Sequence, residues 1–361
     1  MKLKIFFLLS VLIILFLWTF IPKLRDIKQR SDILPTSKNE PSPTITTTPI
    51  LSSYIIPSKS HVLQTFNNCG PATLSMILSY YNIQVSQQEL GLKMRPYQHP
   101  TGDNDDKSIF VDEFVTYAKE FNVESLHRPN GDLNIVKAFI SNDIPVVVRS
   151  WLHPNEDIGH FRIIRGYDDE KKVVIQDDSY DGKDLEISYD TFIEMWQPFN
   201  YGYILVYPKD KENIVTTILK DNMDSQKAWK KSLDKSESEI AKNYNIQYAY
   251  FNQSVSYYYL KEYEKSILAY EQIQDKLPSR MLWYQIEPIK SYLELKKYDT
   301  VFSLTSNILN NNNKGFSELY IIQGKAFEGQ GRDDLAKQEY SKAVFYNKNY
   351  AEELNSKINS L

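Results

Sequence analysis

The spacing of apolar residues predicts an amphipathic helix early in the chain. Between residues 72 and 81, apolar side chains recur at spacings of three and four, at Leu74, Ile77, Leu78 and Tyr81. A helix would carry these side chains on one face and bury them in a core. Pro71 suits the first turn of this helix, where its missing N–H leaves no hydrogen bond unmade.

The patterns that follow predict helices first and strands afterwards. Ser86, with Glu89 three residues later, forms a capping box before a short helix. Further amphipathic helices are predicted at residues 110–121 and 133–141. Strands are predicted at residues 144–148, 159–168, 171–178 and 199–208, with a strand leading into a helix within 185–196. This order indicates an α+β domain over residues 61–208.

Residues 209–361 have a helical pattern that repeats. Segments aligned on Ser266, Val301 and Ala336 are 35 residues apart, and the segment resembles the tetratricopeptide repeat, whose period is about 34 residues. The matching large, small, aromatic and proline positions are Tyr250, Ser254, Tyr257, Ser266, Tyr270 and Pro278, then Tyr292 and Val301, then Tyr320, Gly324, Phe327, Ala336 and Tyr340. Small residues let antiparallel helices approach and aromatic rings fill the groove between them. We expect an all-α superhelix, and residues 214–242 to add helices that cap or join it. This array either binds a peptide or partner protein or acts as a structural spacer.

The first 60 residues predict a membrane anchor and a linker. Residues 5–22 are uncharged and apolar, long enough for a helix that crosses a bilayer. No small-residue cleavage site follows, so residues 1–30 fit an uncleaved anchor better than a removed signal. Basic residues follow the apolar run, and by the positive-inside rule they favour a cytoplasmic location for the rest of the chain. The Ser-, Thr- and Pro-rich residues 31–60 instead resemble an exposed spacer, and we expect a single-pass protein with its catalytic domain outside the cytoplasm.

Composition narrows the classes of function. The chain has 361 residues, of which 42% are hydrophobic and 24% charged, which is typical of globular proteins. A formal net charge of −4 argues against a general nucleic-acid binder. One cysteine and five histidines leave little material for a structural zinc site. The loop with His99, Asp103, Asp105 and Asp106 lacks the pattern of a calcium loop, so we expect neither a metal nor a cofactor.

The single cysteine, Cys69, is placed where a thiol becomes reactive. It lies at the predicted start of the first helix, where the helix dipole and unpaired N–H groups favour the thiolate. Gln64, five residues earlier, is placed to offer its side-chain amide to an oxyanion. A buried structural cysteine is the alternative interpretation, because free cysteines are among the most buried residues.

Two motifs give the chain its resemblance to a known family. The residues QTFNNCGPA contain Gln64 and Cys69, and GHFRIIRGYD contains His160. Both resemble motifs of the bacteriocin-processing, double-glycine cysteine peptidases, which have a papain-like fold. The resemblance implies that Cys69 attacks the scissile carbonyl, Gln64 helps to build the oxyanion hole and His160 is the general base. The family commonly has Asp before the cysteine, where this chain has Asn68. His153 is the nearest alternative to His160 in the sequence, but it is not surrounded by the residues of this motif.

The third catalytic residue that the resemblance implies is an acid that orients His160. Asp177 and Asp178 both end a predicted strand, and successive strand residues point to opposite faces, so only one of them can reach His160. Counting back from Phe192 and Trp196, which resemble a following F-x3-W helix, aligns Asp178 with the family's Asp.

These observations predict a membrane-anchored cysteine peptidase that acts on a peptide or protein substrate. The predicted site is Cys69, His160, Asp178 and Gln64. Family precedent suggests cleavage after Gly-Gly, but the chain lacks the many spans and ATP-binding motifs of a transporter. The alternatives are a non-catalytic peptide-binding scaffold and another thiol-dependent acyl transfer in the cell envelope.

Overall fold

The computed structural model describes residues 47–96, 109–311 and 313–361. Contacts group Thr46–Leu361 into one compact unit, and every described residue lies in it. The predicted anchor at residues 5–22 and the loop with His99, Asp103, Asp105 and Asp106 lie outside the described residues. Within the described ranges, no helix has both the length and the apolar character needed to cross a membrane.

A seven-stranded antiparallel sheet organises residues 47–219, which we call the sheet region. Its strands are β1 (Ser53–Ile55), β2 (Glu124–Arg128), β3 (Val146–Trp151), β4 (Gly159–Asp168), β5 (Val173–Asp178), β6 (Gly182–Ser188) and β7 (Tyr203–Tyr207). The strand order is β2-β7-β3-β4-β5-β6, and β1 pairs with the C-terminal end of β4. The predicted strands are thus present, and together they bury the long central strand β4, which begins with Gly159 and His160.

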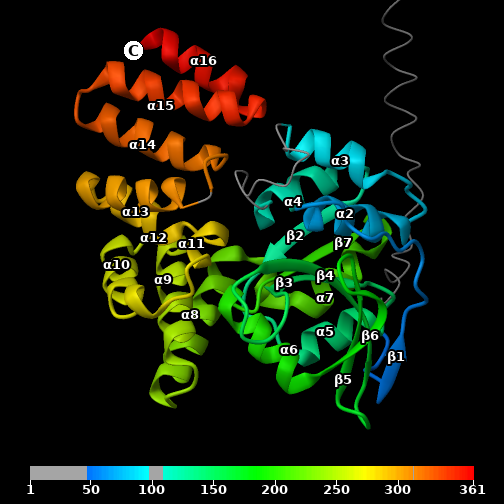
Figure 1. The fold of residues 1–361 in the computed structure, drawn as a ribbon. Helices are drawn as coiled ribbons and strands as arrows, with labels where there is room; N and C mark the ends of the chain where they lie inside the picture. Colours follow the sequence, from blue (N-terminus) through cyan, green and yellow to red (C-terminus); the bar gives the residue numbers. More distant parts are fainter. Residues whose placement is uncertain (1–46, 97–108, 312) are drawn as a thin grey trace, which may run out of the picture. The chain divides into compact units, whose positions relative to one another are not determined.

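Helices cover both faces of this sheet (Figure 1). On one face lie α2 (Cys69–Ser79), α3 (Gln87–Met94) and α4 (Val111–Lys119), and on the other lie α5 (Leu133–Ile140), α6 (Tyr189–Trp196) and α7 (Glu212–Leu219). Leu74, Ile77 and Leu78 of α2 are fully buried against Phe161 and Ile163 of β4, as their spacing predicts. Ser86 caps α3, and its side chain accepts a hydrogen bond from the Glu89 N–H. The predicted α+β class is confirmed.

One strand and two boundaries differ from the sequence-based prediction. Ser53–Ile55, placed in the linker, forms β1 because its backbone groups pair with Gly166, Tyr167 and Asp168. β2 was not predicted, since its sequence ESLHR carries little of the alternation that marks a strand. Helix α7 was assigned to the repeat segment, but its Val215 and Leu219 are buried in the core on the sheet. The sheet region therefore begins before residue 61 and extends past residue 208.

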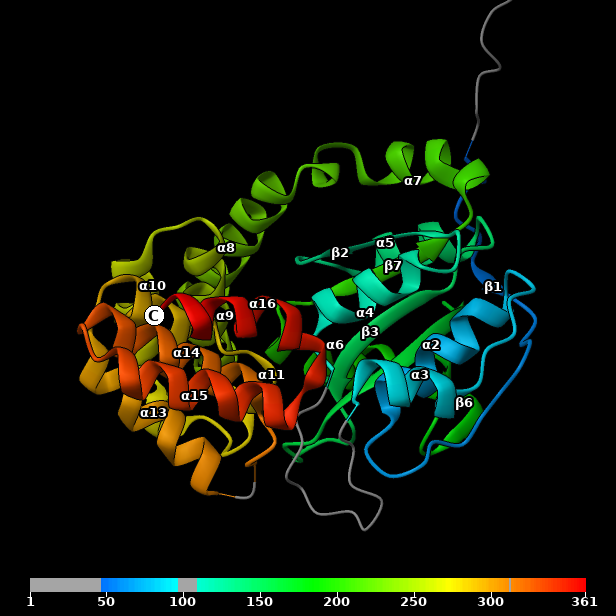
Figure 2. The same ribbon diagram turned by 90° about the horizontal axis from the view of Figure 1, so that it is seen from above.

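Residues 225–361, the helical region, contain helices without strands wherever the structure describes them. Its helices are α8 (Ser225–Ala241), α9 (Ile246–Tyr259), α10 (Tyr263–Glu271), α11 (Met281–Tyr284), α12 (Glu287–Glu294), α13 (Tyr298–Asn310), α14 (Ser317–Gly329), α15 (Asp333–Tyr346) and α16 (Ala351–Ser360). Short 3-10 segments lie within this region at Gln274–Lys276 and Lys348–Tyr350, and before it at Gln197–Phe199, Lys209–Lys211 and Lys220–Met223. Neighbouring long helices pack side by side, as α13 to α16 do in Figure 2.

The small residues singled out in the repeats lie where these helices meet. Ser254, Ser266, Val301 and Ala336 are fully buried, and a Cβ atom added to Gly324 would lie 2.4 Å from the ring of Tyr340. At Gly324, the close approach of the Tyr340 ring therefore depends on the missing side chain. The packing agrees with the predicted all-α array, and its assignment as tetratricopeptide repeats stays a prediction.

Candidate active site

Cys69 is the first residue of α2 and is 7% exposed. The loop before it is held by two side chains: Asn68 donates to the Thr65 hydroxyl at 2.8 Å, and the Arg95 guanidinium donates to the Asn68 side-chain oxygen at 3.2 Å. The side chain of Asn68 makes no capping bond to the helix. The thiol thus lies at an N-terminus with N–H groups free of a side-chain cap, an environment that favours a thiolate.

The surroundings of Cys69 lower the pKa of its thiol. Burial raises the pKa, but a hydrogen bond and the positive charge of His160 outweigh it. The backbone N–H of Phe161 and the charge of Arg149 act in the same direction as His160, so the pKa falls from its ordinary 9.0 to about 7. A substantial fraction of the thiol is therefore ionised near neutral pH.

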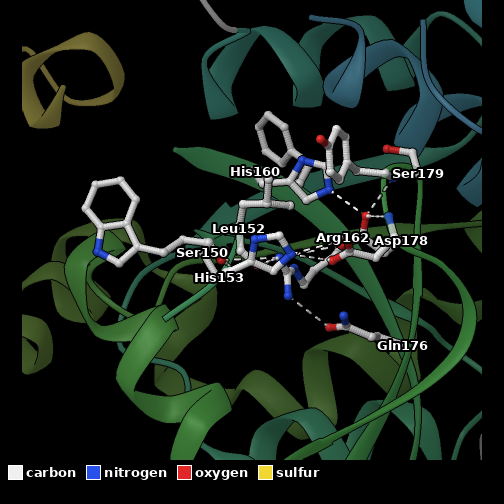
Figure 3. A network of polar contacts seen from close by, with 12 residues as sticks. Ser150, Leu152, His153, His160, Arg162, Gln176, Asp178 and Ser179 are labelled. Atoms are coloured by element: carbon white, nitrogen blue, oxygen red, sulfur yellow. Dashed lines mark hydrogen bonds and ion pairs between the residues drawn. The ribbon is translucent and has the colours of Figure 1, made fainter. Parts of the chain in front are cut away.

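His160 connects the thiol to an acid. Its Nε2 lies 2.8 Å from Oδ1 of Asp178, and both side chains are buried (Figure 3). Burial lowers the pKa of His160, but the hydrogen bonds to Asp178 and Cys69 raise it by more, so the pKa lies above its ordinary value of 6.5. The imidazole is thus held between a carboxylate and a thiol, the arrangement needed to accept and return a proton.

Asp178 is kept ionised by a dense set of donors. Its Oδ1 also accepts hydrogen bonds from the backbone N–H groups of Tyr180 at 2.7 Å and Asp181 at 3.1 Å. Its Oδ2 lies 3.5 Å from Nη2 of Arg162, which is itself held by the carbonyl oxygen of Leu152 at 2.8 Å. Burial raises the pKa of Asp178, but the hydrogen bond and charge of His160 and the charge of Arg162 lower it by more. The pKa therefore lies well below its ordinary value of 3.8.

The neighbouring Asp177 does not contact His160. Its Oδ1 accepts from Nε of Arg165 at 2.9 Å, and its Oδ2 accepts from the Ser58 hydroxyl at 2.7 Å. The register explains this difference, because Arg162 lies opposite Asp178 and Ile163 lies opposite Asp177. His160, Arg162 and Asp178 therefore share one face, and the geometry brings Asp178, not Asp177, to the imidazole.

Gln64 is held beside the thiol by the turn that follows Asp178. The backbone N–H of Gln64 donates to the carbonyl of Ser179 at 2.7 Å, and the Ser179 hydroxyl donates to Oε1 of Gln64 at 2.8 Å. The side-chain oxygen is thereby engaged, which leaves the Nε2 group as the donor. Gln64 lines the same cleft as Cys69 and His160, so its amide is placed to donate to an oxyanion there.

The cleft around these residues has a volume of about 490 Å³. Its lining comprises Gln64, Thr65, Phe66, Asn67, Cys69, Leu152, Ile158, Gly159, His160, Tyr180, Arg280, Trp283 and Tyr284. His153, the other histidine considered, is absent from this lining and contacts Glu156 and Asp181 at 3.1 and 3.0 Å. Within the described ranges, no three His, Cys, Asp or Glu residues are grouped to hold a metal ion.

The comparisons with known proteins agree with the resemblance for part of the chain. Residues 54–204 match the Peptidase_C39 like family. The double-glycine peptidase resemblance is thereby confirmed for this region, which is similar to cysteine peptidases. No curated protein matches the chain.

Three solved structures align with less than half of this chain. A C39-like peptidase from Bacillus anthracis aligns at 16% identity over 44% of this chain and 98% of its own, with a TM-score of 0.35. The peptidase domain of Streptococcus ComA, a bifunctional ABC transporter in a quorum-sensing pathway, aligns at 18% identity over 42% and 100%, with a TM-score of 0.34. A double-glycine motif protease from an AMS/PCAT transporter, in complex with the leader peptide, aligns at 16% identity over 44% and 99%, with a TM-score of 0.33.

Sequence reasoning missed several residues that hold the site. Arg162 is completely buried, and it braces Asp178 within a strand whose other residues are mostly apolar. Two arginines inside the apolar run FRIIRG were a usable signal, because a buried charge needs a partner. Ser179 and the cleft residues from the helical region had no such signal, since their contacts join segments far apart in sequence.

Proposed function

We propose that the protein is a cysteine peptidase whose site is Cys69, His160, Asp178 and Gln64. The Cys69 thiolate attacks the peptide carbonyl carbon, and a C–S bond forms while the carbonyl oxygen becomes an oxyanion. The Gln64 Nε2 group and the backbone N–H of Cys69 stabilise that oxyanion. Collapse of the intermediate breaks the C–N bond, and the leaving amine takes a proton from the His160 imidazolium.

The second half of the reaction releases the acid product. His160, now neutral, accepts a proton from water, and the resulting nucleophile attacks the thioester carbonyl. The C–S bond breaks, the carboxylic acid leaves and the thiolate–imidazolium pair returns. Asp178 keeps the imidazole oriented and stabilises its positive charge through the 2.8 Å contact with Nε2.

The observation that supports this proposal most is the continuous contact chain from Cys69 through His160 to Asp178. It opens into the cleft that also contains Gln64. A structural cysteine would need neither the lowered thiol pKa of about 7 nor a buried imidazole with an ionised partner. The family match over residues 54–204 supports the same class of reaction.

The decisive test is the pH dependence of Cys69 alkylation by iodoacetamide, measured on the full chain. The alkylation rate should rise with pH through a midpoint near 7, because only the thiolate reacts. In His160→Ala the favourable bond and charge are lost while burial remains, so the midpoint should move up by about one unit or more. His153→Ala serves as the matched control and should leave the midpoint unchanged. Slow labelling that is indifferent to His160 would favour the scaffold alternative.

The substrate and the location of the protein are further parts of the proposal. We propose a peptide or protein substrate, and mass spectrometry of a synthetic peptide mixture would identify its products; incorporation of an added amine would indicate acyl transfer instead of hydrolysis. The apolar run at residues 5–22 supports a single-pass anchor with the catalytic site outside the cytoplasm. Digestion of intact cells by an external protease should then degrade the site region, and full protection would contradict this orientation.

A further inference from the structure

One wall of the cleft beside Cys69 comes from the helical region. Arg280, Trp283 and Tyr284, of α11 and the residue before it, line the same cleft as Cys69 and His160. A Cβ atom added to Gly159 would lie 3.0 Å from ring atoms of Tyr284. Gly159 directly precedes His160, so a ring of the helical region packs one residue from the imidazole.

This wall is fastened to the sheet region. Asp157 accepts hydrogen bonds from the Ser279 hydroxyl at 2.8 Å and from Nη1 of Arg280 at 2.6 Å. On the other side of Tyr284, the Gln285 side chain donates to the carbonyl of Pro198 at 2.8 Å. Contacts on both sides of α11 fix its position. A substrate in the cleft therefore binds to a preorganised surface and does not have to order a mobile segment.

The chemistry of the cleft favours an apolar ligand group. Phe66, Ile158 and Tyr180 in its lining are 46%, 41% and 59% exposed. The lining contains no Asp or Glu among the described residues, and its Arg280 is already paired with Asp157. The Arg280 guanidinium also lies over the Trp283 ring, 5.5 Å from its centre, which holds this partly exposed ring in place.

We propose that the helical region supplies a specificity wall of the active-site cleft, with Trp283 as its main contact for a bulky apolar or aromatic side chain of the substrate. The inference rests on the proposed peptidase function and adds a role for α11 that a separate partner-binding array would not have. Trp283 contacts the substrate side chain, while Arg280 and Asp157 position the indole. An aromatic or aliphatic side chain placed against the indole removes apolar surface from water and needs no charged partner.

The test uses tripeptidyl chloromethyl ketones on the full chain, because they need no known substrate. The Cys69 thiolate forms a C–S bond with the methylene carbon and chloride leaves. One probe carries only glycine, a series carries phenylalanine at each of the three positions in turn, and a matched series carries glutamate. The proteins compared are the wild type, Trp283→Ala, Trp283→Phe and Phe345→Ala, where Phe345 is an exposed aromatic residue of the helical region outside the cleft. Iodoacetamide, which carries no side chain, reports the thiol alone.

We expect one phenylalanine probe to alkylate wild-type Cys69 about tenfold faster than the glycine probe, and glutamate to give no gain. Trp283→Ala should reduce that advantage to about twofold or less, and Trp283→Phe should keep most of it. Phe345→Ala should keep all of it and should label with iodoacetamide at the wild-type rate. Each advantage is the ratio of two probe rates in the same protein, so a change in access to the thiol that affects both probes cancels.

Two results would overturn the inference: equal rates of the phenylalanine and glycine probes with the wild type, or an unchanged phenylalanine advantage in Trp283→Ala. Both are distinct from failure of the peptidase proposal, which shows as slow iodoacetamide labelling that does not depend on His160. A thermal melt of each variant separates loss of the cleft wall from loss of the fold.

Discussion

The sheet region and the helical region bury polar side chains for different purposes. In the sheet region, Arg162 and Asp178 form an ion pair with both side chains fully buried, and Arg165 and Asp177 form another with side chains 1% and 2% exposed. In the helical region the buried polar groups include hydroxyls: Ser291 donates to Ser266 at 2.8 Å, and Ser254 donates to the carbonyl of Ser266 at 2.7 Å. Ion pairs such as Lys230–Asp234 lie at its surface.

The difference shows what each region has to hold. Burying a charge costs several kcal/mol unless partners replace its hydration, so paired arginines and aspartates persist where a charge must stay at a fixed place. Serine and glycine instead occupy little space between neighbouring helices, and they let these helices approach closely. In the sheet region the buried pairs therefore hold two carboxylates at fixed places, while in the helical region small side chains allow close packing of helices.

The largest expected effect is loss of the reactive groups. Cys69→Ala and His160→Ala should each reduce peptide cleavage by at least about a thousandfold, because members of such a unit act together. Cys69→Ala exchanges a buried residue of the α2–β4 core for a slightly smaller apolar one and should lower the melting temperature only a little. His160→Ala removes a partner of the buried Asp178 carboxylate and should lower it more. Residual cleavage by Cys69→Ala above a tenth of the wild-type rate would place the chemistry elsewhere.

The adjacent aspartates offer a matched pair. Asp178→Asn keeps an oxygen for His160 but removes the charge, so the pKa of His160 should fall, the thiol midpoint should rise and cleavage should drop about tenfold. Asp177→Asn weakens the buried pair with Arg165 and should instead lower the free energy of unfolding, by about 3 kcal/mol.

Alkylation profiles and denaturant titrations of both variants check this assignment. A shift of the thiol midpoint in Asp177→Asn without one in Asp178→Asn would contradict these different roles of the two aspartates.

A crowding mutation probes the helical region. Gly324→Ala adds a Cβ that would lie 2.4 Å from the Tyr340 ring, so either this ring or the two helices α14 and α15 must shift. We expect destabilisation of about 2 kcal/mol, measured by urea unfolding, with the iodoacetamide rate at Cys69 unchanged. Lys325→Ala, an exposed neighbour in α14, is the control. A stable Gly324→Ala protein would show that close helix approach is not required there.

The smallest expected effect concerns Glu287, a buried carboxylate of the helical region. Its Oε1 accepts from the Tyr259 hydroxyl at 3.0 Å, and among the described residues its Oε2 has no hydrogen-bond partner. Burial raises the pKa of Glu287 above its ordinary value of 4.5. As pH rises, this carboxyl therefore ionises in the unfolded chain before it does in the folded protein, and the free energy of unfolding falls as pH increases above 4.5. Glu287→Gln should therefore raise the melting temperature by about 2 °C at pH 8, with no gain at pH 4. Equal gains at both pH values would rule out the charge as the cause.

The sequence predicted those parts of the molecule that depend on local patterns. The helix starting at Cys69, the strand starting with Gly159 and His160, and the different directions of Asp177 and Asp178 follow from spacing and alternation. β1 was missed because its three residues pair only with distant β4. The position of Trp283 and Tyr284 beside the cleft depends on packing between segments more than 100 residues apart in the numbering, which no local pattern encodes.

The burial of a single reactive thiol has a consequence for oxidation. Peroxide reacts with thiolates, and the sulfenic acid that forms is normally rescued by a second thiol, as a disulfide. This chain contains no cysteine besides Cys69, so rescue has to come from a small external thiol that enters the cleft. Without one, further oxidation to sulfinic acid is irreversible for such a protein. In oxidising surroundings, its working lifetime would therefore depend on the supply of reductant as well as on the stability of its fold.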